Sequence, residues 1–490
     1  MSDVQKPWVC MRTSPDERPP TRTRRRAPRS GWGYAIALFG CWLPYWLAFF
    51  PGVIATDPLT QWQQITTGRY NSIHPVAHTL LLWVLTRPGH SFGTASLIHI
   101  GITAVLFGLV FASVRRLGAP RWLVWMSVTW LILCPAYGWY VIAVWKDNAF
   151  GLAVLWMSLL FLWATERGAL TAGLARGVGC ALGLLCVFRH NGPIVALPML
   201  AVVAWRYGLR AAARAGGVCL LLAAAAVAVA RAGHISHASI AVQQQPVIHL
   251  VAGLINAGTP LSPKDREEIE ALAPLPLWRD DFTCVTDTQA LVNWLPLSVA
   301  LHQDRWAPFR LSLRLGLRNP RALAAHFACV TRYLWAPQSR VNIGIIPPPG
   351  DDVMQVLARG EAVNPNPFGL HTAPLWPAAN RWLSRVLVAT FQPGSVLRLV
   401  VWQPAFPLYV VLGSLIVTLW RTREAAAFVV LAPALINAAQ WLIFSIGPYG
   451  RYEWPVMLLA PLALCLSGTE LSKLRGGVGR SPSPQGATVG

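Results

Sequence analysis

The chain has 490 residues, of which 54% are hydrophobic and 12% are charged. A soluble domain carries roughly 25% charged residues, and several apolar runs here reach the roughly 20 residues that cross a bilayer as a helix. This composition excludes an ordinary soluble protein and indicates a polytopic membrane protein. The net charge is +21. Because the arginines gather at the ends of apolar runs, membrane topology and anionic lipid headgroups explain this charge better than nucleic acid does.

The apolar runs predict an all-α protein with about ten membrane spans and both termini in the cytoplasm. Residues 1–31 are polar and arginine-rich, which predicts a disordered basic cytoplasmic tail, and residues 473–490 predict a second tail. Residues 74–85 are apolar but too short to cross, so we expect them to lie in the membrane interface. The predicted spans cover residues 32–54, 92–114, 122–140, 149–164, 177–188, 193–205, 215–230, 396–420, 425–444 and 456–466.

A long region without a convincing span separates the early spans from the late ones. It covers residues 232–395 and holds Pro-rich turns and several acids. We interpret it as a periplasmic insertion, partly folded on the membrane surface. It lies between a membrane domain at residues 32–231 and C-terminal transmembrane helices at residues 396–472.

Two local features of this insertion give sharper predictions. Ser262, followed by Pro-Lys-Asp, is typical of a helix N-cap, and it predicts an amphipathic helix that ends near Leu272. The insertion also holds two cysteines, Cys284 and Cys329. They fit either a disulfide, which an oxidising compartment allows, or burial as small apolar side chains.

The first polar segment after the first apolar run is unusually rich in reactive groups. Pro51-Gly52 is followed by Asp57, then by several glutamines, and then by His74-Pro75. A plain turn needs only a few polar residues, whereas this segment places an acid, an imidazole and several amides just above a lipid surface. We interpret the loop at residues 55–91 as the mouth of an active site.

The other unusual polar groups fall on the same side of the membrane in this topology. The cytoplasmic ends of the spans carry simple arginine clusters, while five mixed clusters lie at the outer ends. Ionisable groups at membrane depth are costly and indicate a functional site by default. The five clusters are Asp57, His74, Lys146-Asp147, Arg189-His190-Asn191 and Arg451-Tyr452-Glu453.

Four of the five clusters also have a simpler structural interpretation. Asp57 could be a helix-end acid in water, and Lys146 and Asp147 could form a local pair. The turn at residues 189–192 could simply end a helix at its glycine. Residues 451–453 could anchor the chain at the interface and form an ion pair. The functional interpretation is favoured because a single orientation rule places all five clusters together.

The chemistry of this set suits a lipid phosphate. Arginine offers a planar fork to phosphate oxygens, and lysine offers a point charge. A carboxylate beside them suits a general base that takes a proton from an attacking hydroxyl. Whether a cofactor is needed is unknown: Asp147 could hold a divalent cation that steadies the leaving phosphate, or Lys146 and the arginines could do so without metal.

At these residues the chain resembles the GT-C superfamily of integral membrane glycosyltransferases, closest to an uncharacterised bacterial multi-span branch. The resemblance implies that the catalytic base is the acid of the first outer loop, Asp57. It implies a second outer acid near the donor phosphate, Asp147, and a polyprenyl-phosphate sugar as donor. The motifs that carry it are Pro51-Gly52 with Asp57, His74-Pro75, Lys146-Asp147, Arg189-His190-Asn191-Gly192, and Arg451-Tyr452 with Pro455.

The sequence therefore predicts a multi-pass glycosyltransferase of the bacterial inner membrane with a periplasmic active site. It would move a sugar from a polyprenyl phosphate to an envelope glycan or lipid. An O-antigen ligase or polymerase and a lipid or polysaccharide transporter stay as alternatives. The expected catalytic residues are Asp57 and Asp147, and the expected substrate-binding residues are His74, Lys146, Arg189, His190, Asn191, Arg451, Tyr452 and Glu453.

Overall fold

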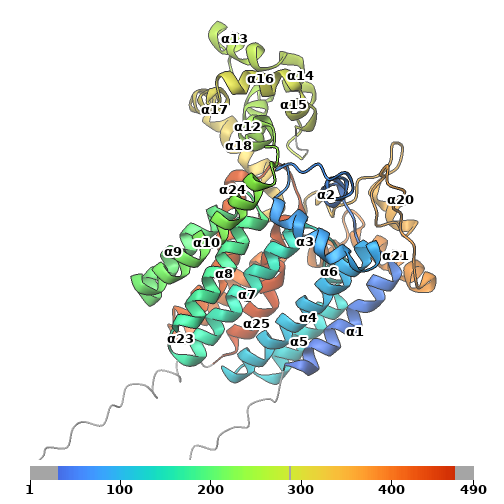
Figure 1. Cartoon of the computed structure of the whole chain (residues 1–490), viewed down its shortest axis with the longest axis vertical. Helices are drawn as coiled ribbons and strands as arrows, with labels where there is room; N and C mark the ends of the chain where they lie inside the picture. Colours follow the sequence, from blue (N-terminus) through green and yellow to red (C-terminus); the bar gives the residue numbers. More distant parts are fainter. Residues whose placement is uncertain (1–30, 286–287, 470–490) are drawn as a thin grey trace, which may run out of the picture.

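The protein is a helical bundle with a smaller helical domain at one end (Figure 1). The computed structural model describes residues 31–285 and 288–469. Within those ranges, extended pairing is limited to isolated bridges between single residues. The predicted tails at residues 1–31 and 473–490 lie outside the described residues, apart from Gly31.

Several bundle helices are long and apolar enough to cross a membrane, which confirms an all-α membrane protein. A further candidate is the pair α5 (Arg121–Leu133) and α6 (Pro135–Val141), bent by 68°. The bend follows from Pro135, because a proline disfavours helical backbone in the residue before it. The five straight candidates are α4 (Phe92–Arg116), α7 (Lys146–Arg167), α10 (Leu209–Ala232), α23 (Ala405–Thr422) and α24 (Ala426–Phe444).

The other predicted spans are helical but shorter, so the expected count of about ten spans is not confirmed. The predicted span at residues 396–420 is divided at Gln403-Pro404 into α22 (Val396–Trp402) and α23, of which only α23 is a candidate span. The interfacial segment predicted at residues 74–85 forms α3 (Val76–Thr86). The short helices at the remaining positions are α1 (Trp32–Ala48), α8 (Ala172–Phe188), α9 (Gly192–Tyr207) and α25 (Trp454–Ser467).

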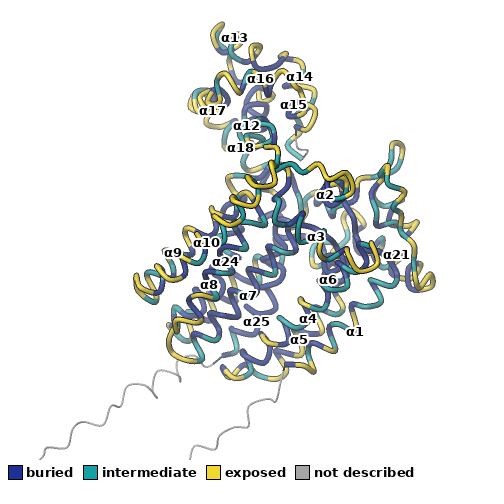
Figure 2. The backbone as a smooth tube through the Cα atoms, in the orientation of Figure 1, coloured by how far each residue is buried: buried dark blue, intermediate teal, exposed yellow. Residues whose placement is uncertain are grey.

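Helices α7 and α25 form the centre of the bundle, and α9 and α10 lie at its edge (Figure 2). Gly151 of α7 allows this close packing, since a Cβ there would lie 2.6 Å from the Trp454 ring. Polar side chains also join the helices: Ser158 donates to the Val430 carbonyl at 2.8 Å, and Tyr137 donates to the Met457 carbonyl at 2.7 Å. The start of α7 is thereby fixed at one end of the bundle.

The predicted insertion divides into two parts. Residues 233–330, which we call the cap domain, form a separate helical unit with its own apolar core. The predicted helix is confirmed as α13, with Ser262 in a capping box with Asp265, and the disulfide between Cys284 and Cys329 is present. The cap helices are α11 (Ile240–Gln243), α12 (Gln245–Asn256), α13 (Pro263–Leu272), α14 (Leu275–Asp280), α15 (Gln289–Asn293), α16 (Leu295–Gln303), α17 (Ala307–Arg318) and α18 (Pro320–Val330).

Residues 331–395 return to the bundle and join its core instead of lying on a surface. They hold α19 (Arg332–Trp335), α20 (Val353–Ala358) and α21 (Pro377–Phe391). Helix α21 packs against α1, and Asn380 donates to the Ala48 carbonyl at 2.9 Å. This return brings loops of the predicted insertion next to the first loop of the chain.

The disulfide predicts a measurable contribution to the stability of the cap domain. It closes a separation of 45 residues, for which the chain-entropy model gives roughly 4 kcal/mol. Replacing both cysteines by serine should destabilise the cap domain by about 2–4 kcal/mol, measured by thermal unfolding and protease susceptibility. Cys41→Ser, at an exposed free cysteine, is the control. Equal gel mobility with and without reductant, together with two free thiols by mass, would contradict the prediction.

Candidate functional site

The loop that carries Asp57 is held from both sides by backbone hydrogen bonds. On one side Val53 bonds to the segment before α7, with Val53 N–H to the Ile142 carbonyl at 3.2 Å. On the other side Ile54 N–H donates to the Ala362 carbonyl at 2.9 Å. Asp57 then falls in the first turn of α2 (Thr56–Thr67), where a helix N-terminus favours a negative charge. These bonds bring the first loop next to the start of α7.

Asp57 forms ion pairs with two cations that come from distant parts of the chain. Its Oδ2 lies 2.8 Å from Lys146 Nζ and 3.2 Å from Arg451 Nη1. Lys146 Nζ also lies 3.0 Å from His74 Nδ1. A neutral imidazole can accept this bond from the ammonium. The side chains of Asp57 and Lys146 are 16% and 17% exposed, so ligands can still reach both.

Asp147 forms a second, more deeply buried half of the same network. Its side chain is 1% exposed and forms an ion pair with Arg189, while its Oδ2 lies 3.6 Å from Arg451 Nε. Arg189 Nε donates to Asn191 Oδ1 at 3.1 Å. Arg451 therefore joins both carboxylates. Below, the charge cluster means Asp57, Lys146, Asp147, Arg189 and Arg451.

The simpler interpretations of two of these clusters are wrong. Lys146 pairs with Asp57 and not with its neighbour Asp147, because consecutive helical side chains point in different directions. Arg451 likewise pairs with Asp57 and Asp147 and forms no ion pair with Glu453. Both clusters thus make long-range contacts.

Burial and neighbouring charges set the protonation states around the cluster. Burial raises the pKa of Asp57, but the charges of Arg451 and Lys146 outweigh it and hold that pKa well below its usual range. Burial, with Lys146 nearby, lowers the pKa of His74 to about 3. Burial raises the pKa of Glu453 well above its usual range, against the opposing charge of Arg189. The charge cluster itself holds three cationic side chains and two carboxylates, so it has one more positive group than negative groups.

A polar cavity opens above Asp57 and Arg451. Its volume is about 420 Å³, and residues from the first loop, the cap domain and the returning segment line it. Asp57, His74 and Arg451 lie in its wall. The lining residues are Ala55, Thr56, Asp57, Thr60, Ile73, His74, Gln289, Asn293, Asn342, Gly344, Ile346, Asn364, Tyr449 and Arg451.

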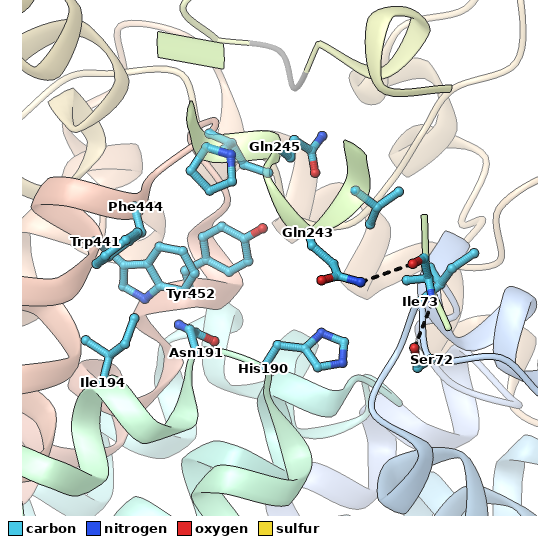
Figure 3. Close-up of a pocket in the computed structure, with 14 residues that line it drawn as sticks. Ser72, Ile73, His190, Asn191, Ile194, Gln243, Gln245, Trp441, Phe444 and Tyr452 are labelled. Atoms are coloured by element: carbon cyan, nitrogen blue, oxygen red, sulfur yellow. Dashed lines mark hydrogen bonds between the residues drawn. The ribbon is translucent and has the colours of Figure 1, made fainter. Parts of the chain in front are cut away.

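A second, mainly apolar cavity of about 600 Å³ lies beside the first, and Ile73 borders both. Figure 3 shows Trp441 and Tyr452 side by side on one wall, with His190 and Asn191 below them. The two aromatic rings are stacked with centroids 4.0 Å apart. The Arg189 guanidinium lies 4.8 Å from each ring centroid, so the cavity wall contacts the charge cluster directly.

The ten predicted site residues fall into three groups. Asp57, His74 and Arg451 line the polar cavity, and His190, Asn191 and Tyr452 line the apolar one. The remaining four are in the lining of neither cavity: Lys146, Asp147, Arg189 and Glu453. Glu453 is fully buried, and neither carboxyl oxygen has a hydrogen-bond partner in the described chain.

The carboxylates of the cluster do not fit a divalent metal. Lys146 and Arg451 contact Asp57, and Arg189 and Arg451 contact Asp147, so cations of the protein already neutralise both acids. Among residues 31–285 and 288–469, no group of three or more His, Cys, Asp or Glu side chains is placed to hold a metal ion.

Sequence reasoning missed four carboxamide residues in the wall of the polar cavity. They come from the predicted insertion: Gln289 and Asn293 lie in the short helix α15 (Gln289–Asn293), and Asn342 and Asn364 lie in loops, where asparagine is an ordinary turn residue. The sequence has no local pattern that distinguishes these amides from ordinary surface amides, because it does not show that residues 331–395 return to the bundle. The four are Gln289, Asn293, Asn342 and Asn364.

Comparisons with known proteins give no relative for this chain. No family model, no curated protein and no solved structure matches it.

The depressed pKa of His74 predicts an acid-dependent loss of stability. The unfolded chain binds a proton near pH 6.5, whereas the folded imidazole does so only near pH 3, so stability falls as the pH drops between these values. At pH 5 this costs roughly 2 kcal/mol. His74→Gln should remove that part of the loss, measured by thermal unfolding at pH 7 and pH 5. His371→Gln, at an exposed histidine, is the control. An equal loss in His74→Gln and the unmodified protein would contradict the prediction.

Proposed function

We propose that this protein is a membrane glycosyltransferase that moves a sugar from a polyprenyl phosphate to an envelope glycan or lipid. The observation that carries the proposal is the position of the charge cluster, which contacts an apolar cavity on one side and a polar cavity on the other. One net positive charge at this boundary suits a lipid phosphate, because the lipid chain and the phosphate need different surroundings.

The apolar cavity supports the lipid side of the proposal. Ile194, Phe444 and Ile446 contribute apolar walls. Three buried N–H donors in the lining of the same cavity have no partner in the described chain, namely Asn191 Nδ2, Gln245 Nε2 and Trp441 Nε1. Such donors are costly unless a ligand supplies acceptors, and phosphate oxygens are acceptors only. The cavity thus combines an apolar surface with donors for an oxygen-rich head.

The polar cavity supports the reacting side. Asp57 is ionised there and can take a proton. The acceptor hydroxyl oxygen attacks the anomeric carbon of the donor sugar, and the bond from that carbon to the phosphate oxygen breaks. The hydroxyl proton passes to Asp57, and the polyprenyl phosphate leaves with the electron pair. An arriving phosphate that draws Lys146 or Arg451 away from Asp57 would raise the proton affinity of the carboxylate at the same time.

The cations divide into two roles in this proposal. Lys146 and Arg451 are partly exposed and stabilise the charge on the leaving phosphate. Arg189 is 5% exposed and is paired with Asp147 and Asn191, so it acts as a positioning residue. Asp147 likewise positions Arg451, since its side chain is only 1% exposed.

The periplasmic face of an inner membrane is the side we propose for the site. A disulfide in the cap domain suits an oxidising compartment. The opposite ends of the helices carry arginines, including Arg115 and Arg116 in the last turn of α4 and Arg421 in the last turn of α23, which suits the cytoplasmic side.

The alternatives differ in specific ways. A ligase that uses a lipid pyrophosphate would need the same cations, and a donor series distinguishes it from the proposed enzyme. A transporter is less well supported, because transporter sites lie near the bilayer midplane, while Lys146 and Asp147 are the first two residues of α7.

The proposed orientation predicts which engineered cysteines a reagent can label from each side of the membrane. In a background with Cys10→Ser and Cys41→Ser, a membrane-impermeant maleimide should label Gln303→Cys of the cap domain from outside intact spheroplasts. Ala172→Cys, at the exposed start of α8, should label only after the membrane is opened. Labelling of Ala172→Cys in intact cells, with protection of Gln303→Cys, would reverse the proposed topology.

The proposed roles predict different defects for Asp57 and Arg451. Asp57→Asn keeps the size of the side chain and removes the base, so turnover should fall by about 100- to 10,000-fold with little change in donor affinity. Arg451→Ala should weaken polyprenyl-phosphate binding by about tenfold or more, and Arg451→Lys should restore only part of it because the planar fork is lost.

These variants are compared in lipid-reconstituted protein, with donor binding and turnover measured separately. Arg359→Ala, at an exposed arginine with its own acidic partners, is the control for loss of a guanidinium. Full activity of Asp57→Asn would remove Asp57 from the mechanism. Weakened donor binding in Asp57→Asn with normal binding in Arg451→Ala would mean that the two roles are reversed.

A further inference from the structure

The lining of the polar cavity includes four carboxamide side chains in addition to its two charged residues. Gln289 and Asn293 come from α15 of the cap domain, and Asn342 and Asn364 come from the returning segment. Four amide side chains from three separate stretches thus meet in one cavity of about 420 Å³, a volume within the usual range of small-molecule sites.

Asn364 carries an unused donor in this wall. Its side chain is 4% exposed, and its Oδ1 accepts from Ile346 N–H at 3.1 Å. Its Nδ2 is buried and has no hydrogen-bond partner in the described chain. Because its backbone N–H also donates to the Ile54 carbonyl at 2.9 Å, Asn364 is fixed to the loop that carries Asp57. A buried, fixed and unpartnered donor costs free energy unless a ligand satisfies it.

The other three amides present both donors and acceptors. Gln289 Nε2 donates to Asn293 Oδ1 at 2.9 Å, which leaves the Gln289 carbonyl oxygen and the Asn293 amide nitrogen for a ligand. Asn342 Oδ1 accepts from Gly344 N–H at 2.7 Å, which leaves its amide nitrogen. A ligand that both donates and accepts fits this pattern, and hydroxyl groups do both.

The charges in the cavity do not call for a charged ligand. Asp57 and Arg451 are the two charged side chains of its lining, and they pair with each other at 3.2 Å. We infer that the polar cavity binds a neutral, hydroxyl-rich carbohydrate, and that Gln289 and Asn293 of the cap domain determine which sugar is accepted. Its role as substrate rests on the proposed function, whereas the binding itself does not.

Helix α15 is suited to this role because it is anchored and yet separate from the charge cluster. Leu291 N–H donates to Asp281 Oδ2 at 2.8 Å, and Cys284, five residues before Gln289, is disulfide-bonded to Cys329 of α18. Changes at Gln289 or Asn293 therefore alter the wall without breaking an ion pair. Sugar preference can vary here independently of the reacting groups.

The test is saturation-transfer NMR on the whole protein in nanodiscs. The probes are the methyl glycosides of glucose, galactose, mannose and N-acetylglucosamine, with glucuronate and glucosamine as charged counterparts. At least one neutral glycoside should bind in preference to both charged sugars. Gln289→Ala with Asn293→Ala should weaken it by about fivefold or more, while Gln303→Ala, an exposed amide at the end of α16, should not.

An isosteric variant guards against simple unfolding of α15. Asn293→Asp keeps the size of the side chain but adds a negative charge, so it should weaken the neutral glycoside and gain binding of glucosamine. Thermal unfolding of each variant verifies that the cap domain is folded. The inference would be overturned if the alanine variants bound the neutral glycoside as tightly as the unmodified protein does. It would also be overturned if the unmodified protein bound glucuronate in preference to the neutral glycosides.

The outcomes separate this inference from the proposed function. Glycoside binding that depends on α15, with no sugar transfer from any polyprenyl-phosphate donor, keeps the carbohydrate site and refutes the transferase. If transfer activity is found and its sugar preference is unchanged when Gln289 and Asn293 are substituted, the proposed transferase function is supported and the role of the cap domain is refuted.

Discussion

The structure depends on the pairing of buried charges at one end of the bundle. Charged groups removed from water are costly unless they are paired and hydrogen-bonded, and here two carboxylates and three cations meet with little exposure to solvent. Arg451 contacts both acids, so the last turn before α25 is tied to the first loop and to α7. Because these three elements are far apart in the sequence, satisfying the charges also fixes how the ends of the helices come together.

Sequence reasoning could predict this convergence because it rests on topology alone. Apolar runs and arginine clusters decide which end of each helix carries Asp57, Lys146 and Arg451, and helix ends on one side of a bundle must be close. The partners within the cluster could not be predicted. From the sequence, the adjacent residues Lys146 and Asp147 suggest a local ion pair. The structure shows instead that Lys146 pairs with Asp57 of α2 and that Asp147 pairs with Arg189.

In the predicted insertion the local features could be predicted, but the position of its second half relative to the bundle could not. Local signals identified the Ser262 cap, and the cysteine count left a disulfide open, which the structure contains. The return of residues 331–395 to the bundle core had no local signal, because its helices are short and its loops are rich in Pro and Gly. The polar cavity therefore stayed hidden: half of its amide wall lies in that segment, and an isolated asparagine in a loop looks the same whether it faces solvent or a ligand.

The start of α7 limits how the site can move. Lys146 and Asp147 are consecutive residues of a helix, so their side chains diverge by roughly 100° around its axis. Lys146 holds the helix to α2 on one side, and Asp147 holds it to Arg189 and Arg451 on the other. Rotation of α7 about its axis in either direction lengthens one of these contacts, so the two contacts together restrict this rotation. An anion that competes with Asp57 for Lys146 removes one of the two contacts. The arrival of a negatively charged ligand is thereby coupled to the rotational freedom of α7.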